Sequence, residues 1–362
     1  MNNKKKVLRI AVISVLVAVL IFSSLFLYDR SKRFEYAEKN TIAMGTVVSQ
    51  KIYAEKAGQH ISHVREIIDA LEKTISWRKA ESAVAILNET GTVKSKELAD
   101  ILSVCIKLSE KSDGAFDVTV GGVSSLWNIG EEDERIPSDE EIKEANEQVG
   151  YKNIQIDGSE ITLLSDCRVD LGAIGKGLAC DYVRNYINVC DDIDGAVVSV
   201  GGSNFVHGRY NKNESKITFQ DIADCLVFVS NCFSTHTCYN KKGDKWRVAV
   251  RDPRDENAFL GVISMSEGFV STSGDYERYF EKDGIRYHHI LDGRTGYPAS
   301  SGLISVTIVC DNGLLSDALS TACFVLGEEK SLELLKEYEA SAIFVRDDLT
   351  VSVVGEIEFE KM

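Results

Sequence analysis

A late segment of the sequence carries a carboxylate and two hydroxyl groups at a spacing suited to binding an ion. Residues 316–324, SDALSTACF, lie in an otherwise apolar stretch and place Asp317 four residues before Thr321, with Ser320 beside it. Residues four apart share a helix face, so their oxygens could bind one hard cation such as Mg²⁺. The structural alternative is that Ser316 or Asp317 caps the helix and Thr321 bonds back to its own helix.

A glycine-rich turn offers a second set of polar atoms. Residues 169–181, VDLGAIGKGLACD, place Lys176 among three glycines where a strand is expected to lead into a helix. Backbone amides of such a turn, the helix N-terminus and the lysine could together bind a phosphate. The segment is not a P-loop, because the glycine spacing is too short and Leu178 stands where a metal-binding Ser or Thr is required. A tight turn without a ligand is the alternative.

A third segment, residues 271–298, concentrates aromatic, histidine and acidic residues. It contains His288, His289 and Asp292, and its stretch YERYFEKDGIRYHHIL predicts a hairpin with a central Asp-Gly turn. The richness in Tyr and His could be ordinary strand composition. A Ser-His-Asp hydrolase is conceivable from the residue types, but the sequence has no G-x-S-x-G motif to present the serine.

Composition and charge limit the classes of partner. The chain has 362 residues, of which 44% are hydrophobic and 27% charged, as in ordinary globular proteins. Its formal net charge is −15, and it has no basic run outside the N-terminus. Such a surface repels nucleic acid, so we expect no nucleic-acid partner.

The N-terminal segment predicts a membrane anchor. Residues 10–28 carry no charge over 19 positions, which at about 1.5 Å per residue spans a hydrocarbon core of about 30 Å. A cleaved signal peptide is the alternative, but large residues stand where its cleavage site would be. We therefore expect a cytoplasmic tail at 1–9, a single-pass anchor in the cell membrane at 10–28, a linker at 29–39 and an extracytoplasmic domain at 40–362.

The apolar spacing predicts a mixed fold. Apolar side chains recur on one helical face over 58–75, and Ser138 with Glu141 forms a capping box for a helix that Gly150 is expected to close. A hairpin is expected in NIQIDGSEITLL. Because strands and helices do not alternate regularly, α+β is favoured over doubly wound α/β. We expect further helices near 95–111, 176–190, 315–326 and 329–338, and strands at AVVSV, WRVAVR, LGVISM, ISVTIV, SAIFV and TVSVV.

Six motifs, in order over residues 44–327, together resemble one family, the FAD:protein FMN transferases. This is the ApbE family, whose members were formerly described as thiamine-biosynthesis lipoproteins. The motifs are MGT from Met44, DGAFDVTVGGVSSLW, VDLGAIGKGLACDYV, VSVGGSN, STSGDYERYF with RYHHILDGRTGYP, and SDALSTACFVLG. The chain departs from the family at Gly122 and Gly293, where proline is common, and in a longer polar segment at 209–245.

The resemblance implies an activity and a metal site. The activity is Mg²⁺-dependent transfer of the FMN half of FAD to a Thr or Ser hydroxyl of an acceptor flavoprotein, with release of AMP. The implied metal ligands are the side chains of Asp317 and Thr321 and the backbone oxygen of Ala173, with Ser320 where some members have a further Asp. The implied fold is a T-fold-like domain of the ApbE type that binds FAD, the substrate, in a cleft between two halves.

The resemblance also implies contacts to the flavin and a class of acceptor. The acceptor would be a subunit of a membrane electron-transport complex or an extracellular flavoprotein. For the proton acceptor we choose His289, since imidazole titrates near neutral pH, with Asp292 or Asp275 to orient it. The implied flavin-contacting positions are Met44, Trp77, Ala115, Phe116, Asp117, Asp170, Lys176 and Leu291.

Two other hypotheses fit the same residues. An FAD pyrophosphatase would use water in place of the acceptor hydroxyl and give FMN and AMP. A non-catalytic, membrane-tethered protein would bind FAD without turnover.

Overall fold

The computed structural model describes residues 36–208 and 245–362. The expected anchor at 10–28 and most of the polar segment at 209–245 lie outside the described residues. In the two described ranges, no helix combines the length and the apolar character that crossing a membrane requires.

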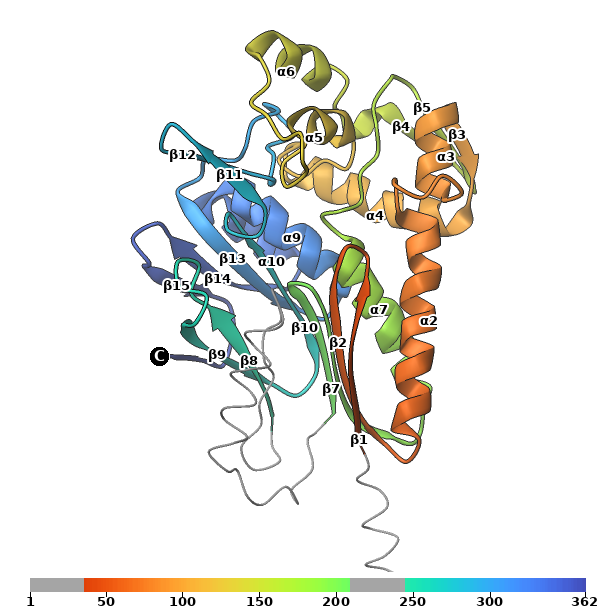
Figure 1. The fold of residues 1–362 in the computed structure, drawn as a ribbon, viewed down its shortest axis with the longest axis vertical. Coiled ribbons are helices and arrows are strands. Elements are labelled where there is room, and N and C mark those ends of the chain that lie inside the picture. The colour runs from red at the N-terminus through yellow and green to blue at the C-terminus, as the bar shows by residue number, and fades with distance from the viewer. Residues whose placement is uncertain (1–35, 209–244) are drawn as a thin grey trace, which may run out of the picture.

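The described chain alternates irregularly between helices and strands, which confirms the expected mixed α+β class (Figure 1). The helices are α2 (Ala57–Ile75), α3 (Ala83–Thr90), α4 (Lys96–Lys111), α5 (Gly121–Trp127), α6 (Asp139–Asn146), α7 (Gly175–Ile187), α9 (Gly313–Leu326) and α10 (Glu328–Glu337), with a 3₁₀ turn at Tyr151–Asn153. The strands are β1 (Tyr36–Ala43), β2 (Thr46–Ala54), β3 (Thr92–Lys94), β4 (Ile154–Asp157), β5 (Glu160–Leu163), β6 (Ile193–Val200), β7 (Ser203–Gly208), β8 (Trp246–Arg251), β9 (Phe259–Met265), β10 (Gly268–Gly274), β11 (Tyr279–Lys282), β12 (Ile285–His288), β13 (Leu303–Cys310), β14 (Ser341–Arg346), β15 (Val351–Val354) and β16 (Phe359–Lys361).

An eight-stranded sheet in the order β1-β2-β6-β7-β10-β13-β14-β15 forms the centre of the fold. All of its strand pairs are antiparallel. Two three-stranded sheets, β16-β9-β8 and β3-β5-β4, and the β11–β12 hairpin complete the described strands. The order brings β7, β10 and α9 together although they are far apart in the sequence, so that residues from distant segments can share one site.

The inner strands of the central sheet are buried on both faces, which explains why β6 and β13 are apolar almost throughout, whereas the edge strand β1 is mostly exposed. Alternate residues of β6 point to opposite faces: Val198 and Val200 join the core under the helices, whereas Val197 joins the core under the small β16-β9-β8 sheet. Helices α2, α7 and α9 contribute to the first core, which is the larger of the two. Each fully buried Val or Leu stabilises the fold by about 1.5–3 kcal/mol.

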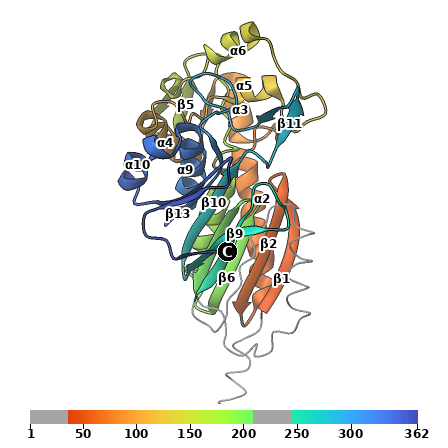
Figure 2. The same cartoon turned by 90° about the vertical axis from the view of Figure 1, so that its left-hand side faces the viewer.

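A third, smaller core lies at one end of the sheet, where α5, α6 and the β11–β12 hairpin gather (Figures 1 and 2). Its centre is the buried ring of Trp127, which stacks on Tyr287 of the hairpin at 5.7 Å and donates a hydrogen bond to the Gly296 carbonyl. The hairpin is thereby fixed to the body of the protein, and the chain that follows it, with His289, is held beside the end of the sheet.

Most expected elements are confirmed, with two differences. The capping box of Ser138 and Glu141 is present, but α6 ends at Asn146 rather than at Gly150, because Gly150 belongs to the turn before the 3₁₀ segment. Strand β1 begins at Tyr36, inside the expected linker, since it pairs along its whole length with β2. The folded domain therefore starts before residue 40.

Two glycines let α7 and α9 approach each other at their first turns. A Cβ atom added at Gly177 would lie 2.0 Å from the carbonyl oxygen of Gly313, and one added at Gly313 would lie 2.2 Å from the carbonyl oxygen of Gly177. Both distances are far below van der Waals contact, so the backbones touch directly. No other residue type fits at either position without separating the helices.

We expect Gly177→Ala to lower the free energy of unfolding by about 1–3 kcal/mol or more, because the added methyl group must push α9 away from α7. Gly58→Ala in α2 is the matched control, since nothing lies within 4 Å of its added Cβ; its effect should stay within about 1 kcal/mol. Urea unfolding of both variants measures the difference. Equal stability of the two variants would contradict the close contact.

Candidate active site

Asp317 is a buried carboxylate inside α9 and not a helix cap. Asn312 caps this helix, accepting a hydrogen bond from the N–H of Leu315 at 2.8 Å. The Asp317 side chain, 4% exposed, accepts hydrogen bonds from the backbone N–H of Gly177 at 2.7 Å and from the hydroxyl of Ser203. The capping alternative is therefore wrong for Ser316 and Asp317, and the carboxylate lies against the glycine-rich turn.

The same contact leaves a carbonyl group of that turn without its usual donor. At the start of a helix, the N–H of Gly177 would normally bond to the carbonyl of Ala173, four residues earlier. Here it bonds to Asp317, whereas the next N–H, that of Leu178, makes the regular bond to Ile174 at 2.9 Å. Within the described residues no backbone N–H donates to the Ala173 oxygen. That oxygen is available to a ligand beside the Asp317 carboxylate.

The hydroxyl groups of α9 meet those of β10. Ser273 Oγ lies 2.6 Å from Ser320 Oγ and 3.3 Å from Thr321 Oγ1. The buried Ser320 hydroxyl also donates to the Asp317 carbonyl at 2.8 Å, so it is engaged within the protein. Thr321 is only half-buried and has this single, longer contact. Of the two hydroxyls, that of Thr321 is the freer to bind an ion.

Lys176 lies where the glycine-rich turn meets two other turns. A Cβ atom added at Gly201, in the β6–β7 turn, would lie 3.0 Å from Cδ of Lys176. The same added atom would lie 2.9 Å from the hydroxyl oxygen of Thr46, at the start of β2. Gly201 has φ +56°, and this left-handed conformation together with the crowding favours glycine. The aliphatic part of the Lys176 side chain thus lies near two segments that are far from it in the sequence.

Arg278 is a second cation of the site, and the sequence reasoning gave it no role. A Cβ atom added at Gly45 would lie 3.9 Å from Nη2 of Arg278. A Cβ atom added at Gly130 would lie 3.5–3.6 Å from the side-chain carbons of Arg278. Together with Lys176 it acts electrostatically on Asp170, Glu277 and His289, so these groups share one region. Arg278 lies within the quoted motif STSGDYERYF, but nothing in its spacing distinguished it from a surface arginine.

The imidazole of His289 is held in one tautomer by the backbone. Its Nδ1 lies 3.2 Å from the carbonyl oxygen of Arg278, which can only accept a hydrogen bond. The proton is therefore assigned to Nδ1, which leaves Nε2 with a lone pair. The side chain is exposed, so Nε2 can accept a proton from a bound molecule.

The surroundings keep this imidazole neutral. Desolvation by the surrounding protein and the positive charges of Arg278 and Lys176 lower the pKa of His289 to about 3. Because the ring is exposed to solvent, the two cations are the stronger physical reason for this direction. An anion placed between His289 and these cations would raise the pKa again.

The two carboxylates expected to orient His289 form ion pairs with arginines instead. Asp292 forms a bidentate ion pair with Arg294, at 2.8 and 2.7 Å, and Asp275 forms one with Arg254, at 2.8 Å for both bonds. Neither hydrogen-bonds to His289. The expectation for Asp292 fails because an arginine two residues away satisfies both of its oxygens; the Arg278 carbonyl orients the ring instead.

Three expected flavin contacts lie around the same region. Met44 occupies the turn between β1 and β2 in a left-handed conformation, with φ +52°. A Cβ atom added at Gly175 of α7 would lie 3.2 Å from the Met44 methyl group. Trp77 follows α2, is 41% exposed, and has the Arg78 guanidinium 4.6 Å from its ring centre. Asp170 hydrogen-bonds to the N–H of Gly172 at 2.8 Å, and its burial raises its pKa. The exposed ring of Trp77 is thus open to a ligand.

The other expected contacts are buried in the scaffold. Asp117 accepts three hydrogen bonds, from the N–H and hydroxyl of Thr119 and from the N–H of Tyr151, so its side chain fixes the local backbone. Burial raises the pKa of this carboxyl group. Ala115, Phe116 and Leu291 are also buried, each at most 8% exposed. A ligand would therefore contact chiefly their backbone atoms.

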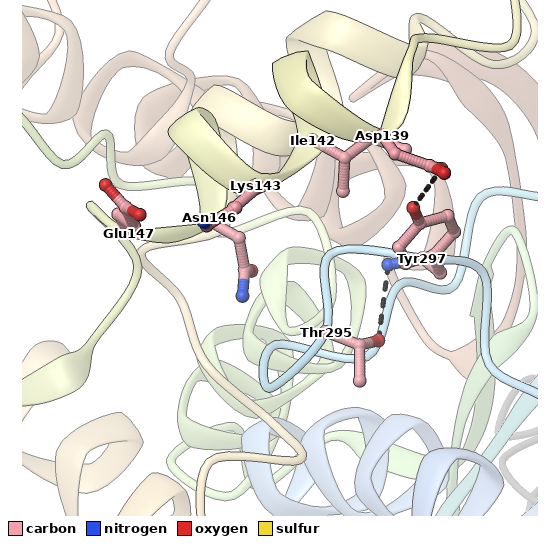
Figure 3. Close-up of a pocket in the computed structure, with 7 residues that line it drawn as sticks. All are labelled: Asp139, Ile142, Lys143, Asn146, Glu147, Thr295 and Tyr297. Carbon is pink, nitrogen blue, oxygen red and sulfur yellow. Dashed lines mark hydrogen bonds between the residues drawn. The ribbon is translucent and has the colours of Figure 1, made fainter.

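Two hollows in the structure lie away from these groups. One, of about 250 Å³, opens between α6 and the loop of Thr295 and Tyr297, where the Tyr297 hydroxyl donates to Asp139 at 2.5 Å (Figure 3). The other, of about 530 Å³, lies between α4, Tyr182 and Leu314. Neither is lined by Asp317, Lys176 or His289. The candidate site therefore rests on the contacts of its side chains.

We expect the His289 ring to remain neutral between about pH 5 and 8 in the ligand-free protein, where an unperturbed histidine would titrate. Replacing Arg278 or Lys176 by Met should raise its pKa, because each change removes a positive charge that opposes protonation. Imidazole NMR resonances measured against pH, assigned with His289→Gln, test this. A wild-type ring that titrates at an ordinary histidine pKa would contradict the electrostatic picture.

Comparisons with known proteins show which family this chain resembles. The model of the ApbE family matches residues 44–344. The FAD:protein FMN transferase of Treponema pallidum (strain Nichols) is 31% identical over 340 residues, covering 89% of this chain and 87% of that protein. The FAD:protein FMN transferase of Escherichia coli (strain K12) is 29% identical over 306 residues, covering 81% and 78%.

Solved structures show the same similarity. The ApbE protein of Thermotoga maritima matches with a TM-score of 0.74 and 30% identity, over 89% of this chain and 97% of that one. The flavinyl transferase ApbE of Pseudomonas stutzeri, in its apo form, matches with a TM-score of 0.70 and 27% identity, over 90% and 95%. This chain is a member of the ApbE family of FAD:protein FMN transferases.

Proposed function

We propose that the protein transfers FMN from FAD to a Thr or Ser hydroxyl of an acceptor flavoprotein, with Mg²⁺ and with release of AMP. The observation that carries the proposal is the joint placement of the Asp317 carboxylate and the unpaired Ala173 carbonyl at the N-terminus of α7. The names of the similar proteins specify the transfer of FMN from FAD, and the side chains at this place fit a diphosphate substrate.

The oxygen atoms present fit a magnesium ion. Asp317, Thr321 and the carbonyl of Ala173 would hold it, since Mg²⁺ prefers oxygen ligands and fills its remaining positions with water or substrate phosphates. Each Asp317 oxygen has one internal hydrogen bond and keeps a further lone pair for an ion. Ser320 is better placed to support the helix than to bind the ion. The bound ion would neutralise charge that develops on the departing phosphate.

The protein supplies its own positive charge to the diphosphate. Lys176 belongs to the glycine-rich turn, the charge of Arg278 acts on the same groups as that of Lys176, and the N-terminus of α7 adds partial positive charge. Phosphoryl transfer depends on positioning and charge neutralisation more than on covalent help. These groups would hold the linkage between FMN and AMP for attack, while Trp77 offers its exposed ring to the flavin.

His289 would take the proton of the acceptor hydroxyl. That oxygen forms a new bond to the phosphorus of the FMN half, the bond from the same phosphorus to the AMP oxygen breaks, and AMP leaves. Nε2 is free to accept the proton because Nδ1 faces the Arg278 carbonyl. The two negative charges of FAD near the ring would raise its pKa toward the range of a useful base.

The uncharged segment at 10–28 supports a location at the membrane. We propose that residues 10–28 anchor the chain in the cell membrane and that the domain acts on the extracytoplasmic side. The acceptor would then be a subunit of a membrane electron-transport complex or an extracellular flavoprotein. The acidic composition, with net charge −15, argues against nucleic acid as a partner.

We expect the full chain, given FAD, Mg²⁺ and a threonine-bearing acceptor flavoprotein, to increase the acceptor mass by one FMN group. Asp317→Asn and Thr321→Ala should each reduce the rate about 100-fold or more, because charge stabilisation in the transition state is lost. Asp100→Asn, an exposed acid paired with Lys96 on α4, is the control and should keep the wild-type rate. Mass spectrometry of the acceptor measures transfer.

Release of AMP distinguishes the alternatives. AMP produced at equal rates with and without acceptor would indicate an FAD pyrophosphatase. FAD binding without AMP release under any condition would indicate a carrier. Either result, or an Mg²⁺-independent transfer, would contradict the proposed function.

A further inference from the structure

Helices α7 and α9 are related by a reciprocal arrangement at their N-termini. In each helix a glycine in the first turn is followed four residues later by an aspartate: Gly177 by Asp181, and Gly313 by Asp317. The two glycine backbones touch, as described above. Because residues four apart share a helix face, both aspartates point toward the partner helix.

Each aspartate accepts a hydrogen bond from the N-terminus of the other helix. Asp317 on α9 accepts from the N–H of Gly177, and Asp181 on α7 accepts from the N–H of Leu314, both at 2.7 Å. Burial raises the pKa of Asp181, whereas the N–H groups of Gly313 and Leu314 favour its charged form. A carboxylate at a helix N-terminus interacts favourably with the helix dipole. The two carboxylates therefore hold the helices in one relative position.

Asp181 is buried at 6% exposure and close enough for the charge of Asp317 to act on it. Its second oxygen, Oδ1, is buried without a hydrogen bond; the Arg184 guanidinium lies 3.2 Å away, but not in hydrogen-bond geometry. Two like charges buried in one helix contact lower the stability of the fold unless hydrogen bonds or opposite charges compensate them. Asp181 has no place among the expected contacts to FAD or metal.

We propose that Asp181 is a positioning residue for the metal site. It fixes the first turn of α9, so that Asp317 keeps its bond to Gly177 and the Ala173 carbonyl stays free, and it adds a second negative charge behind the ion. This inference rests on the proposed function. Outer groups that orient metal ligands typically contribute 10–100-fold to metal affinity.

The experiment uses Mn²⁺ as the probe, with the full chain saturated with FAD. Asp181→Asn keeps an acceptor for the Leu314 N–H but removes the charge, and should weaken Mn²⁺ binding, measured by EPR, about tenfold. Asp181→Ala removes both and should weaken it further. At saturating Mg²⁺ the turnover rate of Asp181→Asn should stay within about threefold of wild type, because no reacting atom is touched.

A second readout needs neither metal nor substrate. In the metal-free protein, Asp181→Asn and Asp181→Ala should speed amide hydrogen exchange in peptides spanning 312–321 and 175–181. Glu141→Gln is the matched control: Glu141 belongs to the capping box of α6, and the change removes a carboxylate from another helix N-terminus. It should leave both Mn²⁺ affinity and exchange in these peptides unchanged.

The outcomes separate the inference from the function on which it rests. Wild-type affinity for Mn²⁺ in both Asp181 variants, or an equal loss in Glu141→Gln, overturns the positioning role while leaving the transferase intact. If the wild-type chain binds no Mn²⁺ in the presence of FAD, the proposed function fails first and the inference fails with it.

Discussion

The contact between the first turns of α7 and α9 determines the candidate site. Gly177 and Gly313 permit the backbones to touch, and the Gly177 N–H then bonds to Asp317 instead of to Ala173. One hydrogen bond thus does two things: it orients a buried carboxylate, and it leaves a backbone carbonyl without its helical partner beside that carboxylate. Backbone and side-chain oxygens from two distant segments become neighbours only through this contact.

The electrostatics of the site differ from those of the chain as a whole. The protein carries a net charge of −15, yet the positive charges of Lys176 and Arg278 act on the same groups. Burial raises the pKa of Asp170 and Glu277, whereas these two cations favour the ionised forms of both carboxyls and the neutral form of His289. A diphosphate entering this region would meet local positive charge on an otherwise acidic molecule. The same ligand would bring His289 toward the pKa of a working base, so binding of the correct substrate would also prepare the base.

Much of the site could be predicted from the sequence, because its key pattern is local. Asp317 and Thr321 share a helix face by spacing alone, and the hairpin before His289 follows from its Asp-Gly turn. The mixed fold also follows from irregular alternation of elements. The position of Ala173 as a ligand came from the family resemblance, and the structure adds a physical reason for it in the unpaired carbonyl.

What the sequence could not show depends on tertiary contacts. Ser203 and Asp181 meet α9 only because β7 and α7 pack against it, and Arg278 is one of many arginines until the turns at Gly45 and Gly130 surround it. The role expected for Asp292 was wrong because proximity in sequence to His289 did not reveal the competing pair with Arg294. Local spacing predicts which residues share a face, but not which partner satisfies them.

In the proposed site, Asp317, Thr321 and the Ala173 carbonyl hold one divalent ion against the diphosphate of FAD. Anomalous scattering from crystals containing FAD and Mn²⁺ tests it most directly. We expect a single strong peak in contact with these three oxygens and with both halves of the diphosphate. A peak elsewhere in the protein, or FAD bound with its diphosphate away from Asp317, would contradict it.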